Sequence, residues 1–468
     1  MKLNGMAGWG RVLIVCACAC SLPRGASFAA DAEREGRVPL AKRILADREL
    51  DDALLRARRL IRKGLNAGDG YGEVWIRDLN TFMELGLQGP DRAPFREALL
   101  MFLRFQGADG DIPDGYIPEA KASVGYKYRR SNLAPGLLAH KNTVETDQET
   151  SLVQAIGKYI VASHDHRFAR EEVGGVTVEN RVYEALEYLW NHRRDAERGL
   201  IWGATTVDWG DVQPEHEWGV ELDERSHRSI DVYDNAMFLI AVGQLAWVNR
   251  NSAPVPSRDV WRLRGHEVRE GLRRDLWDSA KGKFRPHLYL AGSPFPADFE
   301  ENAIWYHGGT AVAIEAGVLT DDEVQATLVA MRENVRKAGA ATIGLTVYPP
   351  YPDGLFKNKG MGAWSYQNGG DWCWFGGRMV RQLIRRGMVE EAYTELKPMI
   401  SRVIRHNGFF EWWTRDNQPR GSGQFRGSAG VLGMAILELQ QWARGNLPEE
   451  PRPVEGKTEY APPPLPGK

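Results

Sequence analysis

The sequence predicts an all-α fold in which twelve helices form two concentric rings, an (α/α)6 toroid. Three observations support this prediction. Helical patterns of apolar residues recur along almost the whole chain after residue 40. Long, Gly-rich loops alternate with short ones between these patterns, which pairs the helices into six hairpins. Regular strand–helix alternation, a GxGxxG motif and a Walker motif are all missing from the sequence. The long loops, with small β hairpins, are expected to gather at one mouth of the toroid.

The helices are expected where apolar residues recur with a period near 3.6. These stretches are 41–63, 76–88, 93–106, 147–163, 179–193, 231–249, 257–275, 308–317, 321–338, 371–386, 388–405 and 428–444. Asp147 is a candidate cap of one helix, and Asp321 and Asp322 stand at the start of another. Two short β-prone segments, 174–178 and 284–290, predict small hairpins between helices.

The composition is that of a soluble globular protein and argues against nucleic acid as the main partner. The chain has 468 residues, 43% of them hydrophobic and 26% charged. Its 60 basic and 62 acidic residues give a formal charge of −2, and no basic stripe stands out. Sixteen tryptophans fit a carbohydrate site but fit a large aromatic core equally well. One catalytic domain is expected over residues 31–446.

The first thirty residues have the features of a secretory signal. Lys2 and Arg11 flank an apolar run at 12–22, which is too short to span a bilayer stably. Small residues at 27–29 suit a signal peptidase, so we expect cleavage near Ala29 or Ala30 and a secreted or periplasmic protein. A lipid anchor at Cys18 or Cys20 is the alternative, and no other association with a membrane is expected.

Cysteine usage and the C-terminal residues complete this outline. Cys16, Cys18 and Cys20 would leave with the signal, so Cys373 alone would remain and no intrachain disulfide could form. Residues 447–468 are Pro-rich and polar, which is typical of a disordered or draped tail.

The segment 407–430 contains the first candidate catalytic group. Its carboxylate, Glu411, is flanked by four aromatic residues: Phe409, Phe410, Trp412 and Trp413. Aromatic walls desolvate a carboxyl group and offer flat faces to a sugar ring. The segment runs directly into a helical pattern, so Glu411 lies in a loop that leads into a helix. A buried Glu411 paired with Arg415 or Arg426 is the structural alternative.

A second candidate group lies where two acids bracket a tryptophan, at Asp208, Trp209 and Asp211. Asp211 is the better general acid, because an ionised Asp208 and an apolar Trp209 both oppose its ionisation and should raise its pKa. An Asp-rich turn that satisfies its own backbone is the alternative explanation.

Three further residues could bind a sugar: Trp75 offers a stacking face, Arg77 several hydrogen-bond donors, and Asp78 an acceptor. This combination suits vicinal sugar hydroxyls, although an Arg–Asp pair at a helix start would give the same pattern. Acid-rich segments at 109–119 and 145–149 keep calcium as an alternative, but their spacing fits no EF-hand. We predict neither a metal nor a cofactor.

Aromatic and amide residues also stand just before two later helices, at 305–309 and 366–375. His307, Asn368 and Trp372 are the candidate substrate-binding residues there, with Trp412 beside Glu411. Core packing could explain each aromatic residue individually.

These motifs resemble those of inverting α-glycosidases with (α/α)6 barrels, the group of processing α-glucosidase, mannosylglycerate hydrolase and trehalase (glycoside hydrolase families 63 and 37). The segment 409–413, followed by Gly421, Gly423, Phe425 and 428–429, is similar to their base motif. The resemblance implies that Glu411 is the general base. The stretch 205–211 is similar both to the family's acid motif and to the D-W-N-D of related phosphorylases, which leaves Asp208 and Asp211 as candidates.

Two other motifs extend the resemblance. Trp75, Arg77 and Asp78 match a substrate-clamping W-x-R-D, and 366–372 looks like the Y-x-N-G-G-x-W of alkaline invertases. The resemblance implies an exo-acting enzyme that hydrolyses an α-linked glucoside or a similar small oligosaccharide with inversion. Two carboxyl groups of an inverting enzyme should stand roughly 6.5–9.5 Å apart on opposite walls of one pocket.

Other functions stay open at this point. A phosphorylase would need an anion site, for which His307, Arg378 or Arg426 are candidates. A β-fructosidase of the same superfamily is a further alternative. A polysaccharide lyase could use Tyr306 and His307, and a non-catalytic glycan-binding protein would keep the tryptophans without needing two opposed carboxylates. The sugar, the linkage and the oligomeric state are not predicted.

Overall fold

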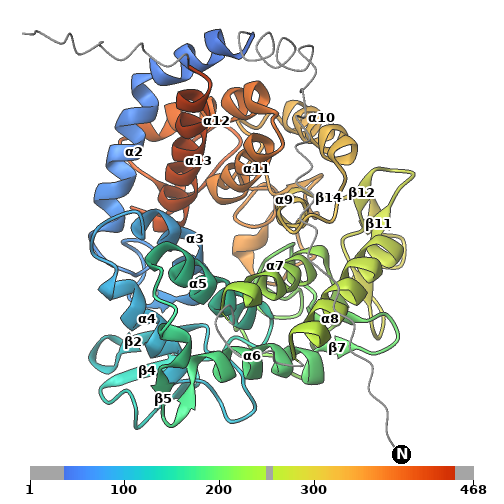
Figure 1. Ribbon diagram of the computed structural model, residues 1–468. Helices are drawn as coiled ribbons and strands as arrows, with labels where there is room; N and C mark the ends of the chain where they lie inside the picture. The colour runs from blue at the N-terminus through green and yellow to red at the C-terminus, as the bar shows by residue number, and fades with distance from the viewer. Residues whose placement is uncertain (1–35, 249–256, 448–468) are drawn as a thin grey trace, which may run out of the picture.

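The computed structural model describes residues 36–248 and 257–447 (Figure 1). The predicted signal peptide (1–30) and, apart from Leu447, the predicted tail (447–468) lie outside the described residues.

The prediction of a mainly helical architecture is confirmed, and each of the expected stretches overlaps a helix. The helices are α2 (Arg48–Ile61), α3 (Ile76–Gly86), α4 (Ala93–Arg104), α5 (Asp147–Ser163), α6 (Val178–His192), α7 (Val232–Val248), α8 (Ser257–Gly271), α9 (His307–Glu315), α10 (Asp321–Ala338), α11 (Cys373–Arg385), α12 (Val389–Arg405) and α13 (Arg426–Gly445). Short helical turns are η1 (Glu119–Lys121), η2 (Phe168–Arg170), η3 (Leu272–Leu276), η4 (Glu301–Ala303) and η5 (Lys359–Met361).

Capping residues explain where several helices begin. The expected helix at 41–63 is interrupted before α2, because Asp47 caps α2 by accepting a hydrogen bond from the amide of Glu49 at 3.1 Å. The predicted start of α10 is confirmed, with a capping box formed by Thr320 and Glu323. Asp147 does not cap α5 as expected. It is the first residue of that helix, and its carboxylate is paired with Arg77 instead.

Six helices, α3, α5, α7, α9, α11 and α13, pack each against the next in sequence, and α13 packs back against α3. In Figure 1 these helices surround the centre of the molecule, and α2, α4, α6, α8, α10 and α12 lie outside them. Burial follows this arrangement. The central helix α11 is buried on nearly all sides, whereas α2 buries one face, with Leu50, Ala53, Leu54 and Ala57 at helical spacing.

Small antiparallel sheets stand at the ends of the helices. One has the order β1 (Val74–Trp75), β2 (Gly115–Pro118), β4 (Leu137–His140), β3 (Tyr128–Arg129), and another pairs β16 (Phe410–Trp413) with β17 (Pro419–Gly423). The other strands are β5 (Glu172–Val173), β6 (Val176–Thr177), β7 (Arg194–Asp195), β8 (Leu200–Ile201), β9 (Gly203–Ala204), β10 (Arg228–Ile230), β11 (Trp277–Asp278), β12 (Lys283–Phe284), β13 (Leu288–Tyr289), β14 (Trp305–Tyr306) and β15 (Val347–Tyr348). Strands β1, β14 and β17 lead directly or within a few residues into α3, α9 and α13, so they fix the loops at the starts of three central helices.

The two predicted hairpins have different outcomes. Strands β5 and β6 form the hairpin expected at 174–178. The segment 284–290 does not fold on itself, because β12 pairs with β11 and β13 pairs with β10. Two neighbouring strands therefore tie one stretch of chain to separate parts of the fold.

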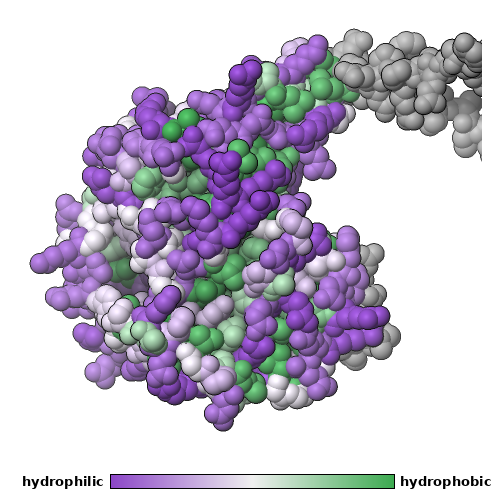
Figure 2. Space-filling view, turned by 90° about the vertical axis from the view of Figure 1, so that its left-hand side faces the viewer, coloured by the Kyte–Doolittle hydropathy of each residue, from purple (hydrophilic) through white to green (hydrophobic). Residues whose placement is uncertain are grey.

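The face of the molecule that carries α2 and α4 is mostly hydrophilic, with hydrophobic residues in small, separated groups (Figure 2). None of the helices within 36–248 and 257–447 combines the length and the apolar character that crossing a membrane requires.

Candidate active site

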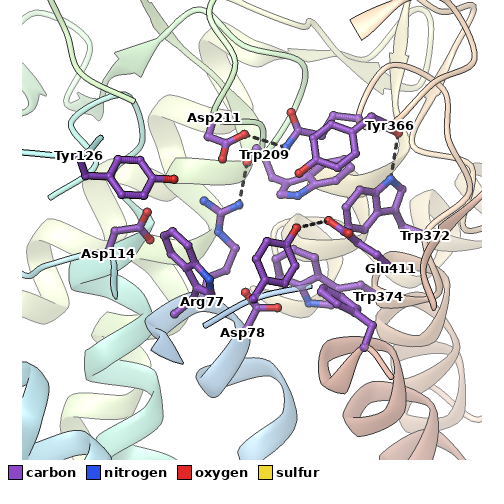
Figure 3. Close-up of a pocket in the computed structure, with 14 residues that line it drawn as sticks. Arg77, Asp78, Asp114, Tyr126, Trp209, Asp211, Tyr366, Trp372, Trp374 and Glu411 are labelled. Atoms are coloured by element: carbon purple, nitrogen blue, oxygen red, sulfur yellow. Dashed lines mark hydrogen bonds between the residues drawn. The ribbon is translucent and has the colours of Figure 1, made fainter. Parts of the chain in front are cut away.

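A cavity of about 220 Å³ lies where the loops preceding α3, α11 and α13 meet the loop before β10. Four acidic groups, one arginine, one side-chain amide and a ring of aromatic side chains converge on it (Figure 3). The residues that line it are Tyr71, Trp75, Arg77, Asp78, Asp114, Tyr126, Trp209, Asp211, Tyr366, Gln367, Trp372, Trp374, Glu411 and Phe425. Segments that are distant in the sequence thus form one pocket.

Glu411 is held on strand β16 by two direct hydrogen bonds. The hydroxyl of Tyr71 donates to Oε1 at 2.8 Å, and the backbone amide of Ser422 donates to Oε2 at 2.7 Å. The residue is only 4% exposed, and this burial raises the pKa of its carboxyl group. The negative charge of Asp211 raises the pKa further, while both hydrogen bonds oppose the rise.

A glycine on the partner strand makes room for this carboxylate. Gly421 has φ of +70°, and a Cβ atom there would lie 2.4 Å from Oε2 of Glu411. Next to it, the Ser422 hydroxyl accepts from the amide of Gly70 at 2.9 Å and donates to Asp69 at 3.1 Å. The hairpin therefore holds the 69–71 loop, and with it Tyr71, against Glu411.

Asp208 lies outside the pocket and is bonded to the start of α9. Its φ is +55°, and both its carboxylate oxygens accept from the amide of Gly309, at 2.9 and 2.8 Å. Anions are favoured at such helix starts. Burial raises the pKa of Asp208 to about 8, and the amides of Gly309 and Gly308 oppose that rise. A Cβ atom at Gly308 would lie 2.6 Å from this carboxylate, so the close approach requires glycine.

The turn over residues 207–210, which contains Asp208, places Asp211 in the pocket. The amide of Gly210 donates to the carbonyl of Val207 at 3.0 Å, which closes the turn. Asp211 is half-buried, and its Oδ1 accepts from the side-chain amide of Gln367 at 3.1 Å. Figure 3 shows Asp211 and Glu411 entering the pocket from different sides. The two predicted catalytic carboxylates are thus brought together in one cavity.

Arg77 is engaged by other protein groups rather than being free to bind a ligand charge. It forms ion pairs with Glu145 and, at 2.6 Å, with Asp147, and it lies 3.4 Å from the carbonyl oxygen of Trp209. The hydroxyl of Tyr233 also donates to Asp147 at 2.8 Å. Arg77 therefore connects the loop before Asp211 to the start of α5.

Two further carboxyl groups, Asp78 and Asp114, line the same pocket. Burial raises the pKa of each to about 7, and the positive charge of Arg77 opposes both rises. Asp78 is placed by the first turn of α3, and Asp114 by the loop just before β2. Either group can accept a hydrogen bond from a sugar hydroxyl.

Indole rings form much of the remaining wall. Trp209 and Trp372 meet edge to face, with centroids 5.2 Å apart, and Trp374 lies 6.2 Å from Trp209. The indole N–H of Trp372 donates to the carbonyl of Tyr366 at 3.0 Å, which fixes its orientation. Trp75, predicted to be a stacking face, also lines the pocket.

Three residues expected to bind substrate lie outside the pocket lining. His307 is buried, with its ring nitrogens 3.0 Å from the carbonyl of Leu345 and 2.9 Å from Asn334, and burial lowers its pKa to about 4. The side chain of Asn368 is occupied by the backbone of Tyr351, from whose amide it accepts at 2.7 Å. Trp412 alternates away from Glu411 along β16, as neighbours on a strand must.

Several residues that line the pocket were not predicted as site residues. Phe425 was expected only as part of the motif around Glu411, and Tyr71, Asp114, Tyr366, Gln367 and Trp374 stand inside or beside other candidate segments. Tyr126 stands in none of them, and its only signal is a tyrosine-rich, basic stretch before β4.

Cys373, the one cysteine within the described residues, lies away from the pocket lining. Cys373 is free and buried, and its sulfur lies 3.1 Å from the guanidinium of Arg402. In the part of the chain that the structure describes, no group of three or more His, Cys, Asp or Glu side chains is placed to hold a metal ion.

Comparison with protein-family models gives no match, and comparison with curated protein sequences gives none either. Solved structures do share the fold. The glycoside hydrolase family 63 mannosylglycerate hydrolase from Thermus thermophilus, in complex with Tris and D-glycerate, superimposes with a TM-score of 0.58 and 18% identity, covering 82% of this chain and 99% of that one.

Two rhamnosidases are similar as well. The enzyme from Klebsiella oxytoca with rhamnose bound has a TM-score of 0.55 at 14% identity, over 85% of this chain and 64% of that one. The family 78 rhamnosidase of Bacillus sp. GL1 has a TM-score of 0.55 at 12% identity, over 83% of this chain and 35% of that one. This chain therefore shares its fold with these glycoside hydrolases.

Proposed function

We propose that the protein is an inverting, exo-acting glycoside hydrolase that cleaves an α-linked glucoside or a similar small oligosaccharide. One observation carries the proposal. Two carboxyl groups, Glu411 and Asp211, enter one aromatic pocket from different sides (Figure 3), as an acid and a base of glycoside hydrolysis must, and inversion further requires that they stand roughly 6.5–9.5 Å apart. The fold shared with glycoside hydrolases supports it.

We further propose that the helices form the predicted (α/α)6 toroid. The contacts of α3, α5, α7, α9, α11 and α13 in a closed cycle support an inner ring. The outer positions of the remaining helices in Figure 1 support an outer ring. In such a toroid the starts of the inner helices meet at one end, which is where the loops before α3, α11 and α13 contribute to the pocket.

In this proposal Asp211 is the general acid and Asp208 is a positioning residue. Asp211 lines the pocket, whereas both oxygens of Asp208 are bonded to the start of α9. A carboxyl group that is buried away from the pocket cannot reach a glycosidic oxygen. The interaction of Asp208 with α9 instead sets the turn that directs Asp211.

The reaction then needs one proton transfer at each carboxyl group. Asp211 protonates the glycosidic oxygen as the bond to the anomeric carbon breaks. Glu411 removes a proton from a water that attacks the same carbon from the opposite face. Tyr71 and the amide of Ser422 stabilise the ionised form of Glu411 that this role requires. Asp78, Asp114 and the indole rings bind the hydroxyls and the apolar face of the sugar.

Hydrolysis is favoured over phosphorolysis by the charges at the site. Among the described residues that line the pocket, Arg77 is the one cationic side chain, and it is already paired with Glu145 and Asp147. The other candidates for an anion site are engaged elsewhere: Arg378 with Glu315 at 2.8 Å, Arg426 with Asn66 at 2.9 Å, and His307 as described. The lyase alternative also loses support, because Tyr306 and His307, the residues it would use, lie outside the pocket lining.

The proposal is tested with kojibiose, nigerose, maltose, isomaltose and trehalose, which join two glucose units through different α-linkages. We expect glucose release from at least one of them, and in proton NMR spectra the glucose whose anomeric carbon is attacked should appear first as the β anomer. For trehalose this means equal amounts of β- and α-glucose at first, because the leaving glucose keeps its α configuration. Early formation of α-glucose from the attacked residue, which for trehalose means α-glucose alone, would contradict inversion. Formation of glucose 1-phosphate in phosphate buffer would contradict hydrolysis.

We also propose export of the protein through its N-terminal segment. N-terminal sequencing of the protein from its native host should find a chain that starts near Ala30 or Asp31. A chain that starts at a lipid-modified Cys18 or Cys20 would instead indicate membrane anchoring.

A further inference from the structure

An exposed tryptophan extends the aromatic wall of the pocket outwards. Tyr126 lines the pocket, and one face of its ring stacks on His140 of β4, with centroids 4.0 Å apart and planes at 14°. Trp218 stacks on the same tyrosine at 5.5 Å and 25°. Trp218 is nevertheless 59% exposed, so most of its surface faces solvent one ring beyond the pocket wall.

The loop that carries Trp218 is fixed at several points. The backbone of Thr143 donates to the carbonyl of Val220 at 2.8 Å, and the hydroxyl of Thr143 accepts from the amide of Leu222 at 2.7 Å. His216 pairs with Asp223 at 2.9 Å. An exposed indole on a well-anchored loop loses little conformational entropy when it binds a partner.

This loop follows Asp211 directly in the sequence, so Trp218 lies on the side of the pocket from which the proposed general acid enters in Figure 3. Asp211 protonates the oxygen between the buried sugar and the leaving group. A ring attached through that oxygen extends from Asp211 towards the solvent. Trp218 stands seven residues after Asp211 and adjoins the pocket through Tyr126. The leaving group is the part of the substrate that Trp218 can reach.

The charges around Trp218 indicate what kind of leaving group fits. Its loop is acidic, with Glu215, Glu217, Glu221 and Asp223. The bases in or beside this loop are paired with its acids: Lys127 with Glu221, Arg225 with Asp223, and His227 with Glu215. These bases are not free to bind a carboxylate in the leaving group, whereas a neutral sugar ring can place its C–H face on an indole.

We propose that Trp218, supported by Tyr126, is a binding platform for the leaving group, and that this leaving group is a neutral sugar ring. The substrate class is thus a disaccharide or longer oligosaccharide, not the glycoside of a small organic acid. The inference rests on the proposed glycosidase function for the identity of the leaving group.

The kinetic test compares Trp218→Ala with the wild type on two substrates that share the buried sugar. One is the best disaccharide of the panel above, and the other is α-glucosyl fluoride, whose leaving group has no ring. We expect kcat/KM to fall about tenfold on the disaccharide, as for a lost stacking contact, and to stay unchanged on the fluoride. Trp218→Phe should recover part of the loss. Equal losses on both substrates, or no loss on either, would overturn the proposal.

A binding test separates this inference from the proposed function. In the Glu411→Gln background, adding Trp218→Ala should weaken the affinity for the disaccharide to about that for glucose, measured by calorimetry, and should leave glucose binding unchanged. Trp247→Ala is the matched control, because Trp247 is 39% exposed on α7 and does not line the pocket. Disaccharide binding that survives Trp218→Ala would refute the platform even if hydrolysis is confirmed. If the wild type binds the disaccharide but does not hydrolyse it, the proposed hydrolase function is refuted. A loss of disaccharide binding in Trp218→Ala, with glucose binding unchanged, would in that case still support Trp218 as a sugar-binding platform.

Discussion

The two proposed catalytic carboxylates are positioned in different ways. Glu411 belongs to a β-hairpin and receives direct hydrogen bonds on both oxygens, from Tyr71 and from Ser422. Asp211 belongs to a loop, is half-buried and accepts a side-chain hydrogen bond from Gln367. The fixed point of its loop is a neighbour, Asp208, which is bonded to α9.

This difference matches the two chemical roles. A general base must stay ionised in a buried place, and direct donors to its carboxylate achieve that. A general acid must hold a proton and give it away, so donors on both of its oxygens would work against it. Because Asp208 anchors the loop, Asp211 is positioned without a second hydrogen bond to its own carboxyl group.

The largest effects are expected from removing either carboxylate. Glu411→Gln should lower kcat about 10²–10⁴-fold on both the disaccharide and α-glucosyl fluoride, because water needs its base with either leaving group. Asp211→Asn should lose similar activity on the disaccharide but recover partly on the fluoride, whose departure needs little protonation. Steady-state kinetics on the two substrates measure the difference. If Asp208→Asn shows the selective recovery and Asp211→Asn does not, the two roles must be exchanged.

Asp208→Asn should act on both substrates alike, by about 10–100-fold, since a displaced turn moves the acid and Trp209 together. The buried amide of Gly309 would also keep one acceptor oxygen in place of two, so the free energy of unfolding should fall by about 1–3 kcal/mol. Urea unfolding measures this loss. An Asp208→Asn variant that is fully active and equally stable would show that the contact with α9 positions nothing.

Gly421→Ala tests how closely the hairpin is fitted to the base. Its Cβ atom would stand 2.4 Å from Oε2 of Glu411 at a φ of +70°, so the carboxylate must move. We expect kcat to fall about tenfold on both substrates, as for a catalytic group displaced from its productive position. Gly387→Ala is a matched control for the backbone strain alone, because Gly387 has φ of +79° and open space around its Cβ position. Equal kcat values in Gly421→Ala and Gly387→Ala would show that the close contact of Gly421 with Glu411 does not position the base.

The smallest effect is a shift in pH dependence. Activity requires ionised Glu411, so it is lost as the pH falls through the pKa of that group. Tyr71→Phe removes a hydrogen bond that lowers this pKa, and the acidic limb of kcat/KM should move to higher pH. A shift of the limb to lower pH in Tyr71→Phe would show that Glu411 is not the group that titrates.

The helices could be predicted because each amphipathic or apolar stretch carries its own periodic signal. Glu411 and Asp211 could be predicted as candidate site residues because each is a carboxylate with a tryptophan within two residues of it in the sequence, and the fold brings both into one pocket. Local sequence also indicated where α10 begins, since capping needs only neighbouring residues.

Roles that depend on distant partners could not be read in this way. His307 looks like a candidate ligand in sequence, but its ring nitrogens bond to Leu345 and Asn334, which no local pattern reveals. Arg77 looks like a free clamp until Glu145 and Asp147 are placed beside it. Tyr126 enters the pocket only because β3, which follows it, joins the same sheet as β1, and its own neighbours in sequence gave no reason to select it.

The hydrogen bond between Tyr71 and Glu411 joins residues 340 positions apart, and α13 packs against both α2 and α3. During synthesis the ribosome would therefore release most of the chain before the partner of Tyr71 exists. Contacts of such long sequence separation form late and slowly in folding. A nascent chain that ends before β16 would leave the apolar faces of α2 and α3 without their partner, a state prone to aggregation. The proposed hydrolytic activity would then appear only once these two distant parts of the chain have met, so measuring it would report on completed folding.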